Sequence, residues 1–276
     1  MTQPAATKLI QELEDMLGVS LFQRDRRGMK LTAHGAIVRR HVDVLLANVD
    51  DLREELKAFD EGASGRIRLG IIPSLSPSLL AGAVATTLVA QPGTRFEMQE
   101  GATDALLSAL ARNDLDIVFG RVLDAQRAEA LNIVPIYTES FAIACSVRHP
   151  LSHRPRVGWH QLSRASWALP ASGTPLRELA DNLFTTHGVL RPRVAVASSS
   201  FHQLRHLIGS SELLGFLPRS IAEPARANGE LALLKPTLGA DFSPISLLSR
   251  ADAEASPAVV AFARTVRQTA LAMGLT

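Results

Sequence analysis

The stretch TQPAATKLIQELEDMLGVSLFQRDRRGMKLTAHG, residues 2–35, decides the fold of the N-terminal part of the chain. Thr2 can cap a helix, Pro4 suits its first turn, where the missing N–H costs nothing, and Gly18 follows the last helix-forming residue. Apolar side chains recur every three or four residues, as on one face of an amphipathic helix: Ala6, Leu9, Ile10, Leu13 and Leu17. The sequence therefore predicts a helix that ends near Gly18.

A hairpin is predicted directly after this helix. The side chains of residues 19–22 alternate in the pattern of a short strand. Residues 24–28 form a charged turn, and residues 29–31 form a second strand that runs back along the first. Residues 20–41 carry a local charge of +5, whereas the whole chain carries only +2. Such a basic patch suits contact with phosphate, although a charged turn on a solvated face would have the same composition.

Polar side chains occupy the rest of the first helix. Gln3 could pair bidentately with adenine, Thr7 could donate a hydrogen bond or touch a thymine methyl group, and Lys8 could neutralise a phosphate. These side chains and the basic patch favour contact with double-stranded DNA.

The same stretch resembles the second half of the winged helix-turn-helix of LysR-type transcriptional regulators. The residues that carry the phrase LE..LG..LF.R......LT..G are Leu13, Glu14, Leu17, Gly18, Leu21, Phe22, Arg24, Leu31, Thr32 and Gly35. The resemblance implies that Gln3, Pro4, Thr7 and Lys8 contact a groove of the DNA. It also implies that Arg24, Arg26 and Arg27 contact the DNA backbone. Lys30 belongs to the same basic patch and is a further candidate for DNA contact.

Members of this family have two further helices before the recognition helix, so residues 1–35 are expected to form a partial winged helix-turn-helix. The alternative is a ligand-binding protein without DNA-binding activity of its own.

Residues 36–60 are predicted to form a linker helix that pairs with a second copy. The apolar positions follow four-three spacing, as in the seam of a coiled coil, and comprise Val38, Val42, Leu45, Val49, Leu52, Leu56 and Phe59. A helix packing on its own domain could show a similar stripe. The spacing favours a homodimer or homotetramer, and it resembles the dimerising linker helix of LysR-type regulators.

After a polar hinge at residues 60–65, strands and helices alternate, which predicts an α/β fold of two lobes on largely parallel sheets. Strands are predicted at 67–72, 95–99, 116–119, 167–169, 193–197 and 213–217, and helices at 77–90, 103–112, 175–187 and 201–208. Ligands of such folds bind beyond the carboxyl ends of the strands, so a cleft is expected between the lobes.

Residues 66–276 also resemble the effector-binding domain of LysR-type regulators, which is similar to periplasmic binding proteins. The matching phrases are GRIRLGIIPSLSPSLL, LDIVFGR, RHPL, LPASGTPLR and LLGFLPRSIAEP. The resemblance implies that lobe one takes residues 66–141 and 244–276 and that lobe two takes residues 142–243. Two phrases resemble the subgroup that includes regulators of galactose-binding protein.

Candidate effector-binding residues lie where predicted strands pass into helices. A small effector, such as a sugar or an organic acid, could bind hydroxyl groups, a guanidinium group and free N–H groups there. The candidates are Ser74, Ser76, Arg121, Ser172, Thr174, Ser199 and His202. Hydroxyl residues before helices commonly serve only as caps.

The sequence favours neither an enzyme nor a metalloprotein. It contains no Gly-x-Ser-x-Gly, P-loop or Gly-x-Gly-x-x-Gly motif, and Pro150 and Pro155 interrupt the spacing of Cys145, His149 and His153. We therefore expect no metal and no cofactor. The single cysteine suits a reducing compartment, and no apolar run is long enough to span a membrane, so a cytoplasmic protein is expected.

Overall fold

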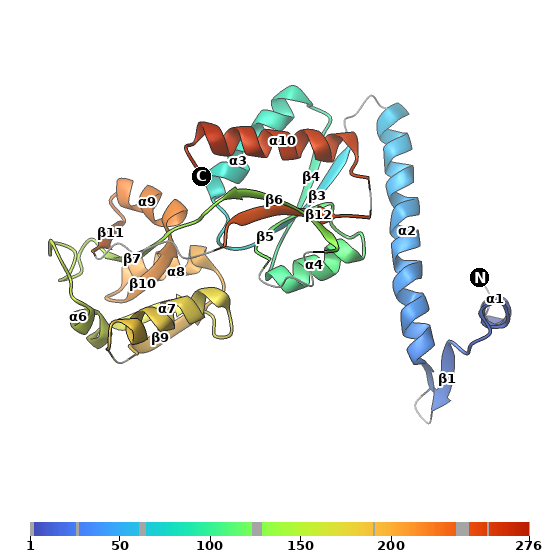
Figure 1. Ribbon diagram of the computed structural model, residues 1–276, viewed down its shortest axis with the longest axis horizontal. Helices are drawn as coiled ribbons and strands as arrows, with labels where there is room; N and C mark the ends of the chain where they lie inside the picture. The colour runs from blue at the N-terminus through green and yellow to red at the C-terminus, as the bar shows by residue number, and fades with distance from the viewer. Residues whose placement is uncertain are drawn as a thin grey trace.

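The computed structural model describes residues 3–25, 28–60, 65–122, 129–189, 191–235, 243–252 and 254–275. The predicted wing residues Arg26 and Arg27 lie outside these ranges. The described residues form an N-terminal head, a long helix and two lobes, each built on a five-stranded sheet (Figure 1).

The head consists of one helix and one hairpin. Helix α1 spans Gln3–Leu17, and strands β1 (Phe22–Asp25) and β2 (Gly28–Leu31) pair antiparallel with Phe22 opposite Leu31. The hairpin is thus confirmed, but the strand predicted at residues 19–22 is wrong. The Glu14 carboxylate accepts the N–H groups of Leu21 and Phe22, which holds the chain before β1 against the end of α1.

Helix α2 spans Ala33–Asp60 and begins earlier than the apolar spacing predicts. The Thr32 hydroxyl accepts the N–H of Gly35 at 3.0 Å and donates to the carbonyl of Ser20 at 2.7 Å, so Thr32 caps the helix. Figure 1 shows α2 standing beside one of the two lobes, with the hairpin at its far end.

Lobe one, as we call it, contains the sheet of order β4-β3-β5-β12-β6, in which β4, β3 and β5 are parallel and β12 and β6 add antiparallel. The strands are β3 (Arg66–Ile71), β4 (Arg95–Glu100), β5 (Ile117–Gly120), β6 (Leu131–Tyr137) and β12 (Ile245–Arg250). Helices α3 (Pro77–Ala90) and α10 (Pro257–Ala272) cover one face, and α4 (Thr103–Ala111) covers the other (Figure 1).

Lobe two contains the sheet of order β11-β7-β10-β8-β9, in which β10, β8 and β9 are parallel. Its strands are β7 (Phe141–Ser146), β8 (Ser166–Pro170), β9 (Arg193–Ser198), β10 (Leu214–Pro218) and β11 (Leu231–Leu234). Its helices are α6 (Trp159–Arg164), α7 (Pro175–Thr186), α8 (Phe201–Ser210) and α9 (Arg219–Ala227).

Strand β7 shows how this sheet separates two apolar layers. Phe141 and Ile143 point into a core shared with α6 and α7, whereas Ala142 and Ala144 point into a core shared with α8 and α9. Successive side chains of a strand point to opposite faces, so a strand that is apolar at every position must be covered on both.

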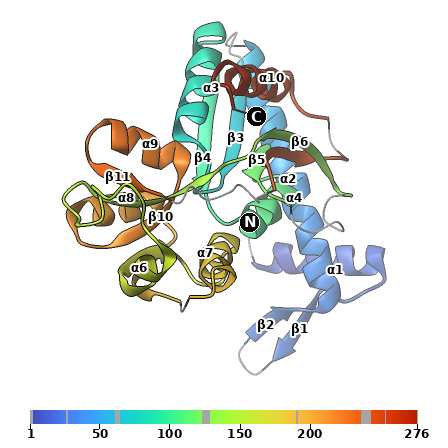
Figure 2. The same ribbon diagram turned by 60° about the vertical axis from the view of Figure 1, so that its left-hand side comes forward.

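The chain passes from lobe one to lobe two between β6 and β7, and it returns between β11 and β12 (Figure 2). The prediction of two α/β lobes with parallel central strands is therefore confirmed. The antiparallel strands β6, β7, β11 and β12 were not predicted.

Candidate functional site: a cavity between two lobes

A cavity of about 500 Å³ lies between the two lobes. From lobe one it is lined by the residues after β3, the start of α4 and the residues after β5: Ile72 to Ser74, Gly101 to Asp104, Leu107, Arg121 and Val122. From lobe two it is lined by the start of α7 and the residues before it, and by the start of α8: Pro170, Ala171, Gly173 to Leu176, Ser199 and Phe201. The cavity thus lies beyond the carboxyl ends of the parallel strands, where ligands of α/β folds bind.

Four of the seven candidate effector residues line this cavity. Ser74 and Arg121 come from lobe one, and Thr174 and Ser199 come from lobe two. They are far apart in the sequence, and the fold brings them together because β3, β5, β8 and β9 all end at the cleft.

Arg121 is the buried charged group of the cavity wall. Its side chain is 9 % exposed, Nη1 donates to Ser74 Oγ at 2.8 Å, and Nε donates to the carbonyl of Ser243 at 3.1 Å. Burial lowers the pKa of Arg121, with Tyr137 and Glu139 acting in the opposite direction. A guanidinium stays protonated in proteins, so the wall carries a partly desolvated positive charge among apolar side chains.

The other three candidates do not line the cavity. Ser76 caps α3 by accepting the N–H of Leu79, the Ser172 hydroxyl lies 3.5 Å from a guanidinium nitrogen of Arg177, and His202 meets the ring of His206 edge to face. Thr174 lines the cavity and is also a helix cap, because its Oγ1 accepts the N–H of Arg177 at 3.3 Å.

The start of α4 is the part of the site that the sequence did not identify. Thr103 and Asp104 begin this helix, and Leu107 follows one turn later on the cavity side. A glycine before a helix, as at Gly101, was the available signal, but it is common at any loop.

A buried polar network joins the lobes behind the cavity. The Ser76 N–H donates to Tyr137 Oη at 2.7 Å, the Tyr137 hydroxyl donates to Glu139 at 3.2 Å, and the Ser220 N–H of α9 donates to Glu139 at 3.2 Å. Burial raises the pKa of Glu139, and it also raises that of Tyr137. The network fixes the crossover from β6 to β7 against helices of both lobes.

The head presents an exposed helix. Thr7 and Lys8 of α1 and Lys30 of β2 are exposed. The ammonium nitrogen of Lys8 lies 3.8 Å from a carboxylate oxygen of Glu12. Gln3 and Pro4 lie in the first turn of α1, and Arg24 lies in β1. The apolar side chain of Leu9 is also more than half exposed.

The predicted coiled-coil seam is exposed along α2. Val38 is half-buried, and the described seam residues that are exposed are Val42, Leu45, Val49, Leu52 and Leu56. Phe59 lies near the end of the helix, outside the side chains that the structure describes.

Within the described residues, no three histidine, cysteine, aspartate or glutamate side chains gather as metal ligands do. None of the described helices is long and apolar enough to cross a membrane.

Two family models match the chain. The model described as LysR substrate binding domain matches residues 60–271, and the model described as Bacterial regulatory helix-turn-helix protein, lysR family, matches residues 1–36.

Curated relatives match nearly the whole chain. The HTH-type transcriptional regulator PcaQ of Agrobacterium fabrum is 25 % identical over 98 % of this chain and 87 % of its own length. The SDS degradation transcriptional activation protein of a Pseudomonas species is 31 % identical over 95 % of this chain and 85 % of its own length.

Solved structures share the fold. A full-length OxyR variant of Pseudomonas aeruginosa has a TM-score of 0.68 at 21 % identity, and the match covers 97 % of this chain and 86 % of the OxyR chain. Full-length CbnR in complex with its target DNA has a TM-score of 0.66 at 20 % identity, and the match covers 98 % of this chain and 91 % of the CbnR chain. The BenM effector binding domain with its effector benzoate has a TM-score of 0.61 at 23 % identity, and the match covers 78 % of this chain and 96 % of the BenM domain. The family models, the relatives and the interlobe cavity lead to one conclusion: the chain belongs to the LysR family of DNA-binding transcriptional regulators, with a helix-turn-helix region followed by an effector-binding domain.

Proposed function

We propose that this LysR-family regulator binds a small organic acid between its lobes, with the carboxylate of the effector beside Arg121 and Ser74. The observation that carries the proposal is the buried guanidinium of Arg121 in the wall of a largely apolar cavity of about 500 Å³. A desolvated cation attracts an anion more strongly than it attracts a neutral sugar, and the apolar lining suits a hydrocarbon body. Thr174 and Ser199 supply hydroxyl groups from the opposite lobe.

Occupancy of this cavity is proposed to regulate a dimer on operator DNA. Contacts with the DNA groove are assigned to Gln3, Pro4, Thr7 and Lys8. Contacts with the DNA backbone are assigned to Arg24, Arg26, Arg27 and Lys30. The exposed apolar seam of α2 supports pairing with a second copy, because that face would otherwise leave several large apolar side chains in water.

The corresponding domain division is residues 1–35, 36–60 and 66–276, with the lobes meeting near residues 141 and 244. The named role of the relatives as transcriptional regulators supports two finer inferences, namely that the chain regulates without catalysing a reaction and that it acts in the cytoplasm.

Ligand binding measured by calorimetry and by thermal shift tests the effector class, with benzoate as the carboxylate probe and D-galactose as the neutral sugar. We expect benzoate to bind and to raise the Tm, and galactose to do neither. Arg121→Met should weaken benzoate binding roughly tenfold or more, because a hydrogen bond to a charged group contributes about 1.5–3 kcal/mol.

Arg148→Met is the matched control, because Arg148 is exposed on lobe two and does not line the cavity. It should leave benzoate binding unchanged. Binding of galactose alone, or equal benzoate affinity in Arg121→Met and the wild type, would contradict the proposed effector class.

The alternative is a ligand-binding protein that does not bind DNA, which the match of residues 1–36 to a helix-turn-helix model disfavours. Selection of fragments from the source genome by the full chain, followed by a mobility shift, distinguishes the two functions. Enrichment of a defined DNA site supports the regulator, whereas ligand binding without any enriched site supports the alternative.

A further inference from the structure

Helix α4 reaches from the effector cavity to the linker helix. Thr103, Asp104 and Leu107 line the cavity at its start, and the turn that follows its last residue, Ala111, carries Asn113. Nine helical residues span about 13 Å, so one rigid element connects the two places.

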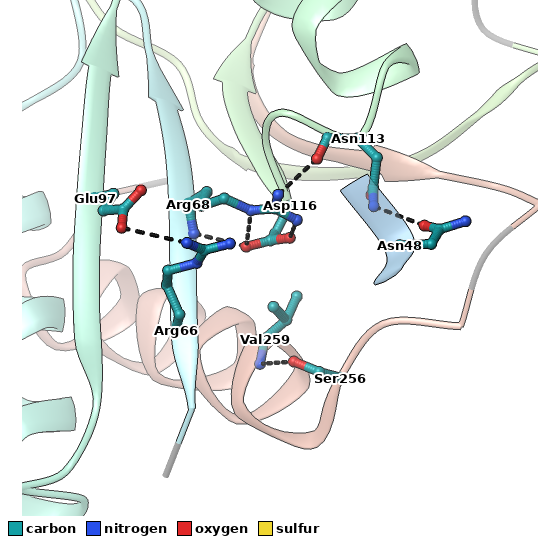
Figure 3. Close-up of polar contacts among 8 residues, drawn as sticks. All are labelled: Asn48, Arg66, Arg68, Glu97, Asn113, Asp116, Ser256 and Val259. Carbon is teal, nitrogen blue, oxygen red and sulfur yellow. Dashed lines mark hydrogen bonds and ion pairs between the residues drawn. The ribbon is translucent and has the colours of Figure 1, made fainter. Parts of the chain in front are cut away.

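Asn113 makes the contact with the linker helix. Its side-chain Nδ2 donates to Oδ1 of Asn48, on α2, at 2.8 Å (Figure 3). Asn113 is only 7 % exposed, and its φ of +63° places it in the left-handed region, which asparagine tolerates better than most residues. The side chain that meets α2 is therefore held by the backbone of the turn.

The turn after α4 is anchored to the sheet. Arg68 of β3 donates from Nη2 to Asp116 at 2.6 Å and from Nη1 to the carbonyl of Asn113 at 2.6 Å. The side chains of Arg68 and Asp116 are 10 % and 18 % exposed, so this ion pair is largely shielded from water. The turn between α4 and α2 is thus tied to β3, whereas the start of α4 borders the interlobe cavity.

Beside this contact lies a space between lobe one and α2. A second cavity, of about 180 Å³, is lined by Asn48 of α2, by Arg66 and Arg68 of β3 and by Ser256 before α10. The Asn48–Asn113 hydrogen bond therefore lies at the edge of this cavity, because both residues line it. Because the turn directly follows α4 and hydrogen bonds weaken steeply with angle, a small change in the direction of α4 that reorients the Asn113 side chain changes the strength of this bond.

We propose that α4 transmits occupancy of the interlobe cavity to the linker helix, and that the Asn113–Asn48 hydrogen bond is the contact through which it acts. This inference rests on the proposed function for the position of the effector. It adds a route by which a ligand at Thr103 and Leu107 changes the position of α2.

Amide hydrogen exchange of the full chain tests the contact. Asn113→Gly removes the side chain while keeping a residue that favours positive φ, and Asn48→Ala removes the partner from a helical position. Each variant should raise exchange at residues 44–52 roughly fivefold, as expected for the loss of one neutral hydrogen bond. The double variant should show no further increase. Asn132→Ala is the control, because the side chain of Asn132 bonds to Arg250 at an edge of the same sheet.

Transmission is tested without a ligand by filling the cavity from lobe two. Ala171→Phe should change exchange both in α4 at residues 103–111 and in α2 at residues 44–52. In Ala171→Phe combined with Asn113→Gly, only α4 should respond. Ala171→Leu, which adds less volume, provides the same comparison if the larger side chain prevents folding.

The inference is overturned if α4 does not respond to the filled cavity, if α2 fails to respond when α4 does, or if α2 responds equally with and without the Asn113 side chain. None of these results depends on effector chemistry, since no ligand is added. Failure of benzoate to bind would instead count against the proposed function and would leave the exchange comparison intact.

Discussion

At the scale of single residues, the hydrogen bonds of Glu14 explain why a glutamate stands at this position of the family phrase. Its carboxylate accepts two backbone N–H groups, those of Leu21 and Phe22, and so joins α1 to the hairpin. Gly35 is explained in the same way, because a Cβ atom there would overlap the carbonyl oxygen of Leu21. These residues hold the head together and are placed by geometry that no periodicity reveals.

Glu14→Ala should lower the free energy of unfolding of the head by about 1–2 kcal/mol, because it leaves two backbone donors without their acceptor. Chemical denaturation followed by exchange at residues 5–25 measures this loss. Asp15→Ala, an exposed neighbour on the same helix, is the control. Equal effects of the two substitutions would show that the Glu14 carboxylate has no special role.

Glu139 should make stability depend on pH. Burial raises the folded-state pKa of Glu139 above its value in the unfolded chain, so the folded state binds the proton more tightly. Its contribution to stability is therefore fully present below the unfolded pKa and is lost as pH rises through the folded pKa. Glu139→Gln should flatten the stability curve over that window. Urea unfolding at a series of pH values measures the slope, and identical slopes in the two proteins would refute the assignment.

At the scale of elements, the sequence predicted most of the parallel core. Helix 77–90 and the strands near residues 67–72 and 193–197 lie within a residue of their predicted bounds, because apolar runs and alternating patterns flanked by turn residues are distinctive in the sequence. Strands β6 and β12 were missed because they pair across more than a hundred residues of sequence, and no local pattern encodes that pairing. For the same reason, the sequence predicted Ser74 and Arg121 as candidates without showing that they are hydrogen-bonded.

Helix α1 makes a measurable prediction for DNA binding. Lys8 is exposed, and if it contacts a phosphate, Lys8→Ala should reduce the slope of log affinity against log salt by about one. Arg26→Ala should do the same. Lys235→Ala, at an exposed position on lobe two, is the control for charge alone. An unchanged slope in Lys8→Ala would place the phosphate contacts on other residues.

Helix α2 makes a prediction for assembly. Leu45→Glu combined with Leu52→Glu should dissociate the dimer, because both side chains lie on the predicted seam and are more than half exposed in the single chain. Sedimentation equilibrium measures the change in mass. Leu46→Glu is the control, since Leu46 is similarly exposed but lies off the seam. Dissociation by Leu46→Glu alone would contradict the predicted register.

At the scale of the whole molecule, effector and DNA should affect each other reciprocally. If the effector changes DNA affinity by some factor, DNA must change effector affinity by the same factor. Ser74→Ala should weaken the response to effector while leaving DNA affinity without effector unchanged, because Ser74 lies in the cavity wall and not in the head. Mobility shifts at increasing effector concentration measure both quantities. A loss of DNA affinity in Ser74→Ala without effector would be inconsistent with this role.

The position of β12 has a consequence for synthesis on the ribosome. Lobe two is one continuous segment, whereas the sheet of lobe one needs β12 between β5 and β6, and α10 to cover one face. Lobe two can therefore fold as it emerges, while the earlier residues of lobe one must wait for β12 and α10, which follow lobe two in the sequence. Until then the inner edge of β5 and the apolar face beneath α10 are open, so the nascent regulator is most vulnerable to aggregation in the segment of lobe one that is made before lobe two.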